Sequence, residues 1–124
     1  MSRRVVITGL GMVSPLGNSV DETWQGMIEG RSGVDRITRF DASEYPASIA
    51  AEVKDFDIRE YIDRREARKM DSFSHYAVAG SMQATKDAGL AEGSFDPERT
   101  GVVLGVGIGG FETLENSYEA LFLK

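Results

Sequence analysis

The chain contains 124 residues, of which 41% are hydrophobic and 27% are charged. This balance is that of a folded globular domain, and it excludes a disordered, collagen-like or coiled-coil chain. The formal net charge is −6 at pH 7, which argues against nucleic acid as a partner. There is no cysteine, so a disulfide, a cysteine-ligated zinc site and a thiol nucleophile are excluded within these residues.

The beginning of the chain bears on its location. Arg3 and Arg4 precede an apolar stretch, as in a twin-arginine export signal, but Gly9, Gly11 and Pro15 interrupt that stretch and no small-residue cleavage site follows. No apolar run reaches the roughly 18–20 residues that a membrane-spanning helix needs. We therefore expect a cytoplasmic protein with no membrane partner.

The first part of the chain predicts a strand, a glycine-rich turn and a helix. The β-branched run Val5–Thr8 is typical of a strand that is buried on both faces, and a turn over 9–17 follows it. Ser19 and Glu22 have the spacing of a capping box, in which a serine caps the helix and a glutamate stands three residues later. Apolar residues repeat at helical spacing over 20–28, and Gly30 is suited to end that helix.

The middle of the chain combines an irregular segment with helical patterns. Residues 31–46 are polar and irregular, whereas 48–53 alternate in the manner of a strand. A short helical turn is predicted over 57–62, and a second capping box begins at Asp63. A longer helix is expected over 71–88. Its small residues Ala77, Gly80 and Ala84 lie on one face, so this helix can pack closely against another segment.

The last part of the chain repeats the order strand, glycines, helix. A proline turn at Asp96-Pro97 precedes a second apolar run over 102–106, which predicts another buried strand, and a helix is expected over 111–122. Strands that alternate with helices favour an α/β layered fold around a mainly parallel sheet. Two or three strands are too few to complete such a sheet, and nothing in the sequence would cover the apolar residues 121–123. We therefore interpret residues 1–124 as the N-terminal portion of a longer chain.

Glycines after the second apolar run form a possible phosphate-binding turn. Gly105, Gly107 and Gly110 fit G-x-G-x-x-G, and backbone amides at a helix start can bind a phosphate. However, the acidic residue that a dinucleotide site needs about 20 residues later would fall at or past residue 124. Close approach of backbones near a pocket is the better explanation, and a nucleotide-binding module stays open as an alternative.

The most informative charge feature is a cluster of four basic residues: Arg64, Arg65, Arg68 and Lys69. At helical spacing all four can share one face. In a chain of net negative charge, this cluster predicts a surface for an acidic protein or a phosphate group. The alternative is a solvated helix face that neighbouring acidic residues partly neutralise.

Other candidate sites receive less support from the sequence. His75 is the single histidine and has no companions at metal-ligand spacing, so we expect it to be structural and predict no metal site. The serines lack the histidine and aspartate context of a hydrolase triad.

Several runs of the sequence together match one family's pattern. These runs are Arg4–Gly17, Gly33, Phe40–Asp41, Val53–Phe56, Arg68–Asp71, Ala88–Leu90 and Gly107–Gly110. In this order they resemble the β-ketoacyl-acyl-carrier-protein synthases, and in particular the synthase II type of fatty-acid synthesis. The resemblance covers essentially the whole chain.

The resemblance implies a thiolase-like fold of α/β/α/β/α layers, of which this chain would hold only part of the N-terminal half. It implies a homodimer that joins an acyl thioester to malonyl-acyl carrier protein by a decarboxylating Claisen condensation, without a metal or nucleotide cofactor. The family's nucleophilic cysteine would lie some tens of residues past Lys124, and its two histidines and a lysine would lie in the second half. We therefore expect no catalytic residue in this segment and no condensation by this chain alone.

Two features carry over residue by residue. The resemblance makes Arg65, Arg68 and Lys69, with the adjacent Arg64, the surface that binds the acyl carrier protein. Ile108, flanked by Gly107, matches the apolar residue that gates the acyl pocket. The alternatives are a polyketide-type ketosynthase fragment, a free-standing module that binds carrier protein without catalysis, and the nucleotide-binding module.

Overall fold

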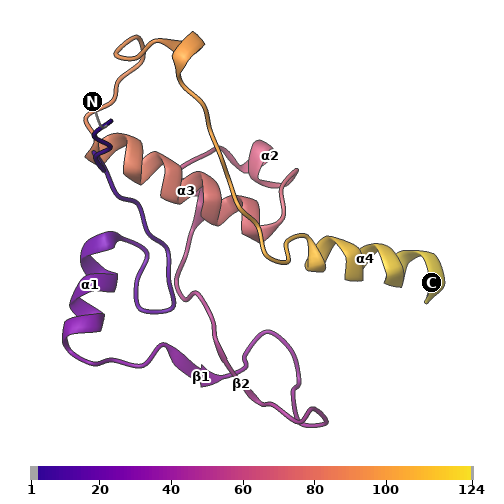
Figure 1. The fold of residues 1–124 in the computed structure, drawn as a ribbon. Helices are drawn as coiled ribbons and strands as arrows, with labels where there is room; N and C mark the ends of the chain where they lie inside the picture. The colour runs from indigo at the N-terminus through magenta and orange to yellow at the C-terminus, as the bar shows by residue number, and fades with distance from the viewer. Residues whose placement is uncertain (1–2, 124) are drawn as a thin grey trace.

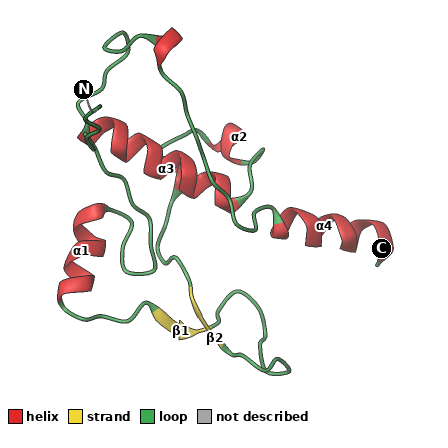
Figure 2. Cartoon of the chain, in the orientation of Figure 1, coloured by secondary structure: helices red, strands yellow, loops and turns green. Residues whose placement is uncertain are grey.

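The computed structural model describes residues 3–123, and its course is drawn in Figures 1 and 2. The helices and strands follow in the order α1 (Val20–Ile28), β1 (Val34–Arg36), β2 (Ile49–Ala51), η1 (Ile58–Glu60), α2 (Arg64–Ala67), α3 (Ser72–Asp87), η2 (Pro97–Arg99) and α4 (Phe111–Phe122). Figure 1 shows α3 in the middle of the fold, whereas α4 extends away from the other elements. No helix within 3–123 has the length and apolarity to cross a bilayer.

The glycine turn after Thr8 packs directly on α3. A Cβ at Gly9 would lie 2.3 Å from the Ala84 carbonyl oxygen, and a Cβ at Gly11 would lie 1.9 Å from the Gly80 carbonyl oxygen. Neither position can therefore carry a side chain without moving the backbone. This contact confirms that the small-residue face of the 71–88 helix packs closely against another segment.

Hydrogen bonds fix the same turn along α3. The Leu10 amide donates to Asp87 Oδ2 at 2.8 Å, and the Met12 amide donates to Gln83 Oε1 at 2.9 Å. Gln83 Nε2 in turn donates to the Asn18 carbonyl and to the Tyr61 hydroxyl. One glutamine side chain thus joins α3 to three other segments.

Helix α1 begins and ends at the predicted residues. Ser19 Oγ accepts a hydrogen bond from the Glu22 amide at 3.2 Å. The Glu22 carboxylate reaches the Asn18 amide at 2.7 Å, one residue earlier than in the usual capping box. Gly30 has a φ of +67°, a conformation that favours glycine after a helix.

The sheet within the described residues is a two-stranded antiparallel pair. Val34 lies opposite Ala51 and Arg36 opposite Ile49. The strand predicted over 48–53 is therefore confirmed in its centre. The prediction that 31–46 is wholly irregular is wrong at β1, because its short polar strand has no apolar alternation that could reveal it.

The region between β2 and α3 is built from short capped turns. Asp63 Oδ1 accepts from the Arg65 and Glu66 amides at 2.8 and 3.1 Å, and it thereby caps α2. A nitrogen of the His75 ring lies 2.9 Å from the Ala67 carbonyl oxygen, which links α3 to the end of α2. The expected structural role of His75 is confirmed by this contact.

Both predicted buried strands, Val5–Thr8 and 102–106, are wrong for the described chain. Neither segment forms a strand, and Val5 and Val103 are 91% and 95% exposed. A strand is held by hydrogen bonds to a neighbouring strand, and no backbone–backbone hydrogen bond joins either run to another segment within 3–123. Their apolar sequence fits a sheet interior, but the described residues supply no partner strand.

The buried core is correspondingly small. Ala42, Ala67, Ala79 and Thr23 are the buried side chains that the described residues provide. The larger apolar side chains of α4 are exposed, among them Phe111, Leu114 and Phe122. Most of the apolar surface that could build a core is therefore still in contact with solvent.

Candidate functional site

The predicted basic cluster consists of four residues at and just after α2, which we call the basic patch and define as Arg64, Arg65, Arg68 and Lys69. All four side chains are exposed. They do not share a long helix, because α2 is a single turn that ends at Ala67, with Arg68 as its C-cap. The Lys69 amide still bonds to the Glu66 carbonyl at 3.0 Å, so the helical course of the backbone continues past α2.

Acidic neighbours neutralise only part of the basic patch. Lys69 Nζ lies 2.6 Å from Glu66 Oε1, and both side chains are largely solvated, so this pair contributes little to stability. Within residues 3–123, no carboxylate lies within 4.0 Å of a charged nitrogen of Arg64, Arg65 or Arg68. These three guanidinium groups are available to carboxylates or phosphates, which Arg binds in bidentate fashion.

A shallow hollow lies beside the basic patch. Arg64 and Arg68 line it together with the apolar side chains of Ile58, Ala67 and Met70. A surface with apolar groups bordered by cations suits a partner that carries both acidic and apolar side chains.

Asp57 and Arg59 border the same hollow with an ion pair. Arg59 Nε lies 2.8 Å from Asp57 Oδ1. Hydrogen bonds from the Arg59 side chain and its amide lower the pKa of Asp57 to about 2. At neutral pH this border therefore carries one negative and one positive charge.

The predicted acyl gate lies on the loop that leads into α4. Ile108 is 81% exposed, and a Cβ at Gly107 would meet nothing within 4 Å. The described residues therefore do not enclose a pocket around these two positions. The next residue is held tightly, since a Cβ at Gly109 would lie 2.9 Å from the ring of Phe73 in α3.

The start of α4 already holds an anion. Asp71 Oδ2 accepts hydrogen bonds from the Thr113 amide at 3.1 Å and from Thr113 Oγ1 at 2.8 Å. The Thr113 bonds are the main cause that lowers the pKa of Asp71, so this side chain is a carboxylate at neutral pH. Because a carboxylate of the chain itself occupies this helix start, the geometry disfavours a phosphate at the Gly105–Gly110 turn.

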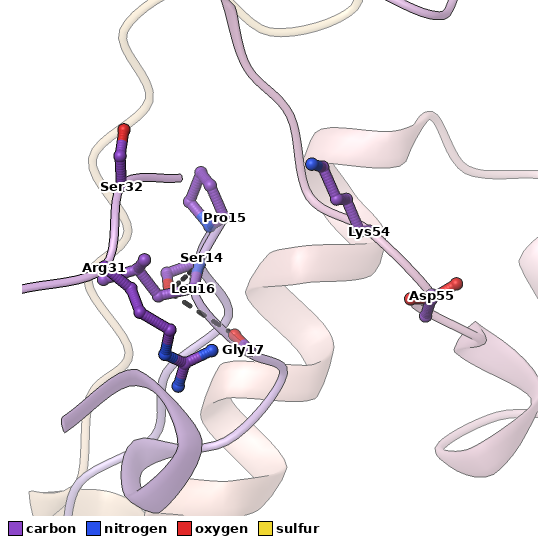
Figure 3. A pocket seen from close by; sticks show the side chains of 8 residues that line it. All are labelled: Ser14, Pro15, Leu16, Gly17, Arg31, Ser32, Lys54 and Asp55. Carbon is purple, nitrogen blue, oxygen red and sulfur yellow. Dashed lines mark hydrogen bonds between the residues drawn. The ribbon is translucent and has the colours of Figure 1, made fainter. Parts of the chain in front are cut away.

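A second hollow lies between the Ser14–Gly17 turn and the Lys54-Asp55 segment, with Arg31 beside the turn (Figure 3). Both cations here are already paired: Arg31 Nε lies 2.9 Å from Glu29 Oε2, and Lys54 Nζ lies 3.2 Å from Asp35 Oδ2. This hollow therefore lacks the free charge that the basic patch has. Among the described residues, no group of three His, Asp or Glu side chains is placed to hold a metal ion.

The sequence does not predict the role of Asp71. Its spacing marks it only as the start of a helix, whereas the structure brings it to Thr113, 42 residues later. Gln83 is missed in the same way, because its partners lie 65 and 22 residues away. Such contacts leave no periodic signal in one sequence.

Solved structures with a similar course are ketosynthases. One is a type II polyketide ketosynthase bound to a hexaketide and in complex with its acyl carrier protein. It matches 100% of this chain and 33% of its own, at 31% identity and a TM-score of 0.78. The ishigamide ketosynthase/chain length factor matches 74% of this chain and 23% of its own, at 41% identity and a TM-score of 0.68. The chain therefore has the thiolase-like fold of the ketosynthases, in part of its N-terminal half.

Sequence comparison agrees with the structural one. The family described as "Beta-ketoacyl synthase, N-terminal domain" matches residues 2–122. The 3-oxoacyl-[acyl-carrier-protein] synthase 2 of Coxiella burnetii is 51% identical over 96% of this chain, and that of Synechocystis sp. is 47% identical over 98%. The chain belongs to the β-ketoacyl synthase family, through the N-terminal domain of that family. It spans 29% of the length of each of these two relatives.

Proposed function

We propose that this chain is the N-terminal portion of a 3-oxoacyl-acyl-carrier-protein synthase of fatty-acid elongation. The observation that carries the proposal is continuous identity of 45–51% to synthases of that name over nearly all of the chain. The reaction is the condensation of an acyl thioester with malonyl-acyl carrier protein. A carbon–carbon bond forms, the malonyl carboxylate leaves as carbon dioxide, and the acyl group leaves its thiol.

The proposed role of the basic patch is to bind the acyl carrier protein. Arg64, Arg65 and Arg68 are exposed and have no acidic partner in the described chain, so they can bind carboxylates of an acidic carrier. The neighbouring hollow with Met70 offers an apolar contact next to these charges. The similar ketosynthase that is in complex with its acyl carrier protein is a precedent for a complex of this kind.

The proposed role of Ile108 is to form a movable wall of the acyl pocket. Its exposed side chain is free to contact an alkyl chain, and Gly107 beside it has open space on the side where a Cβ would stand. Glycine allows the backbone to change conformation at this point. The exposed apolar side chains of α4 are the proposed contact of a homodimer.

The chemical step requires residues that this sequence does not contain. The family's reactive cysteine and its two histidines are expected in a continuation of the chain.

The test is condensation by the full-length protein. Purified protein is incubated with acyl- and malonyl-acyl carrier protein, and the 3-oxoacyl product is measured by mass spectrometry. We expect product from the full-length protein and none from residues 1–124 alone. An open reading frame that stops at Lys124, with binding of carrier protein but no product, would instead establish the non-catalytic binding module.

A polyketide-type ketosynthase is the second candidate, because one of the solved structures described above is a type II polyketide ketosynthase. The two functions differ in the acyl group that is extended. Fatty-acid elongation predicts that saturated acyl chains are extended faster than poly-β-keto chains on the same carrier. The reverse preference would assign the chain to polyketide synthesis.

A further inference from the structure

Helix α4 has no cap of its own. Its N-cap residue is Gly110, which has a φ of +73° and no side chain to accept a hydrogen bond from the first turn. The first amides of a helix need acceptors from elsewhere, because they have no partner within the helix. The start of α4, and the loop 107–110 that precedes it, therefore depends on another part of the chain.

Asp71 supplies this acceptor and caps two helices with one carboxylate. Its Oδ1 accepts from the Ser72 amide at 2.6 Å at the start of α3. Its Oδ2 accepts from both the amide and the hydroxyl of Thr113, in the first turn of α4. Each oxygen serves a different helix, so an amide side chain, which has one acceptor oxygen, cannot replace both.

The same part of α3 also supports the loop itself. A Cβ at Gly109 would lie 2.9 Å from Phe73 Cγ and 2.8 Å from Val106 Cγ1. The backbone of the loop thus rests on Phe73, two residues after Asp71 in the sequence. The carboxylate at the N-cap of α3 and the aromatic ring in its first turn thus both contact the segment 106–113.

We infer that Asp71 is a positioning residue, which holds the Ile108 loop by capping α4 and ties that loop to the basic patch. The expected effect of Asp71 on the acyl chain lengths that are accepted rests on the proposed function, in which Ile108 lines the acyl pocket. Only Met70 separates Asp71 from Lys69 of the basic patch, so a short stretch of chain joins the patch to the carboxylate that holds α4.

The first measurement is hydrogen–deuterium exchange on the full-length protein. In Asp71→Asn, exchange of the amides of residues 111–114 should become about 5- to 10-fold faster, as expected for the loss of a helix cap. Thr113→Val removes only the hydroxyl bond and should give a smaller increase. The matched control is Asp96→Asn, which makes the same change at the carboxylate that caps η2 and leaves both Thr113 bonds in place. Unchanged exchange at 111–114 in Asp71→Asn would overturn the inference.

The second measurement is the ratio of kcat/KM for long over short acyl chains. It should change about 3- to 10-fold in Asp71→Asn, in the same direction in Thr113→Val, and not in Asp96→Asn. The double variant of Asp71→Asn and Thr113→Val should equal Asp71→Asn alone, because both act through one interaction. Faster exchange with an unchanged ratio would show a cap that does not position the gate. If the wild-type protein forms no product, the proposed function fails, and the exchange data alone decide whether Asp71 holds the loop.

Discussion

Residues 9–88 and residues 101–123 are held in very different ways. In the first region, the glycine turn lies directly on α3, and Ala79 of that helix is fully buried. In the second region, Val103 is 95% exposed, and the contacts to α3 described above gather around Asp71 and Phe73. Both regions expose large apolar side chains, such as Trp24 in the first and Phe122 in the second. The first region also uses small residues to bring backbones together, whereas no residue of 101–123 is buried. Close backbone packing therefore stabilises the first region. The stability of the second region depends on burying its exposed apolar side chains against another surface.

The largest expected effect comes from filling the contact between the turn and α3. Gly11→Ala places a Cβ 1.9 Å from the Gly80 carbonyl oxygen, so the backbone must separate. We expect the free energy of unfolding of the full-length protein to fall by about 2–4 kcal/mol, measured by urea denaturation. Gly101→Ala makes the same change where a Cβ meets nothing within 4 Å, and it should cost less than about 0.5 kcal/mol. Equal losses of unfolding free energy in Gly11→Ala and Gly101→Ala would show that the first region is not more closely packed than the second.

The second prediction reverses the charge of the basic patch, in the better-packed region. The triple variant Arg65→Glu, Arg68→Glu and Lys69→Glu should raise the KM for carrier-linked substrate about tenfold or more, because it repels an acidic carrier. Its KM should also depend less on salt than that of the wild type. The stability of the protein should change little, because these side chains are exposed.

The control for the charge reversal is Arg99→Glu, at an exposed arginine that is the last residue of η2 and lies outside the patch. It changes the net charge without touching the proposed docking surface. An equal rise of KM in this variant would assign the effect to overall charge rather than to the patch.

The third prediction concerns the exposed region. Ile108→Phe should lower kcat/KM for long acyl chains about tenfold and leave short chains nearly unchanged, because the larger ring narrows the proposed pocket. The comparison uses the same protein with a series of acyl lengths. Val103→Phe places the same ring in the same region, outside the gate loop, and equal chain-length effects in both variants would argue against a specific gate.

The sequence predicts local features well, because their causes are local. Ser19 and Asp63 cap the helices that they precede, and Gly30 has the positive φ expected after a helix. The small-residue face of α3 is also foreseen, although not the glycines that pack on it. Each of these features follows from a few neighbouring residues.

Features that depend on distant residues are predicted poorly. The runs 5–8 and 102–106 have the composition of buried strands, but pairing requires a second strand that the described residues lack. The chemistry of the basic patch follows from Arg64–Lys69, whereas the length of its helix does not. The contact of Asp71 with Thr113 joins residues far apart in the chain, and one sequence carries no sign of it.

The smallest expected effect concerns the acid titration of Asp57, which borders the hollow next to the basic patch. The pKa of Asp57 is lowered to about 2 from its ordinary value of 3.8, mainly by hydrogen bonds from Arg59. A lowered carboxylate pKa stabilises the fold at pH above about 4, and this contribution is lost as the pH falls from about 4 through 2. The Asp57 carboxyl carbon should titrate near pH 2 in NMR spectra. In Arg59→Gln the midpoint should return towards 3.8, and the stability between pH 2 and 4 should lose part of its dependence on pH. Because the side chain is solvated, the change in stability will be small. A titration midpoint of Asp57 near 3.8 in the wild type would mean that its ion pair with Arg59 does not persist in solution. The hollow beside the basic patch would then be less ordered than the turn packed on α3.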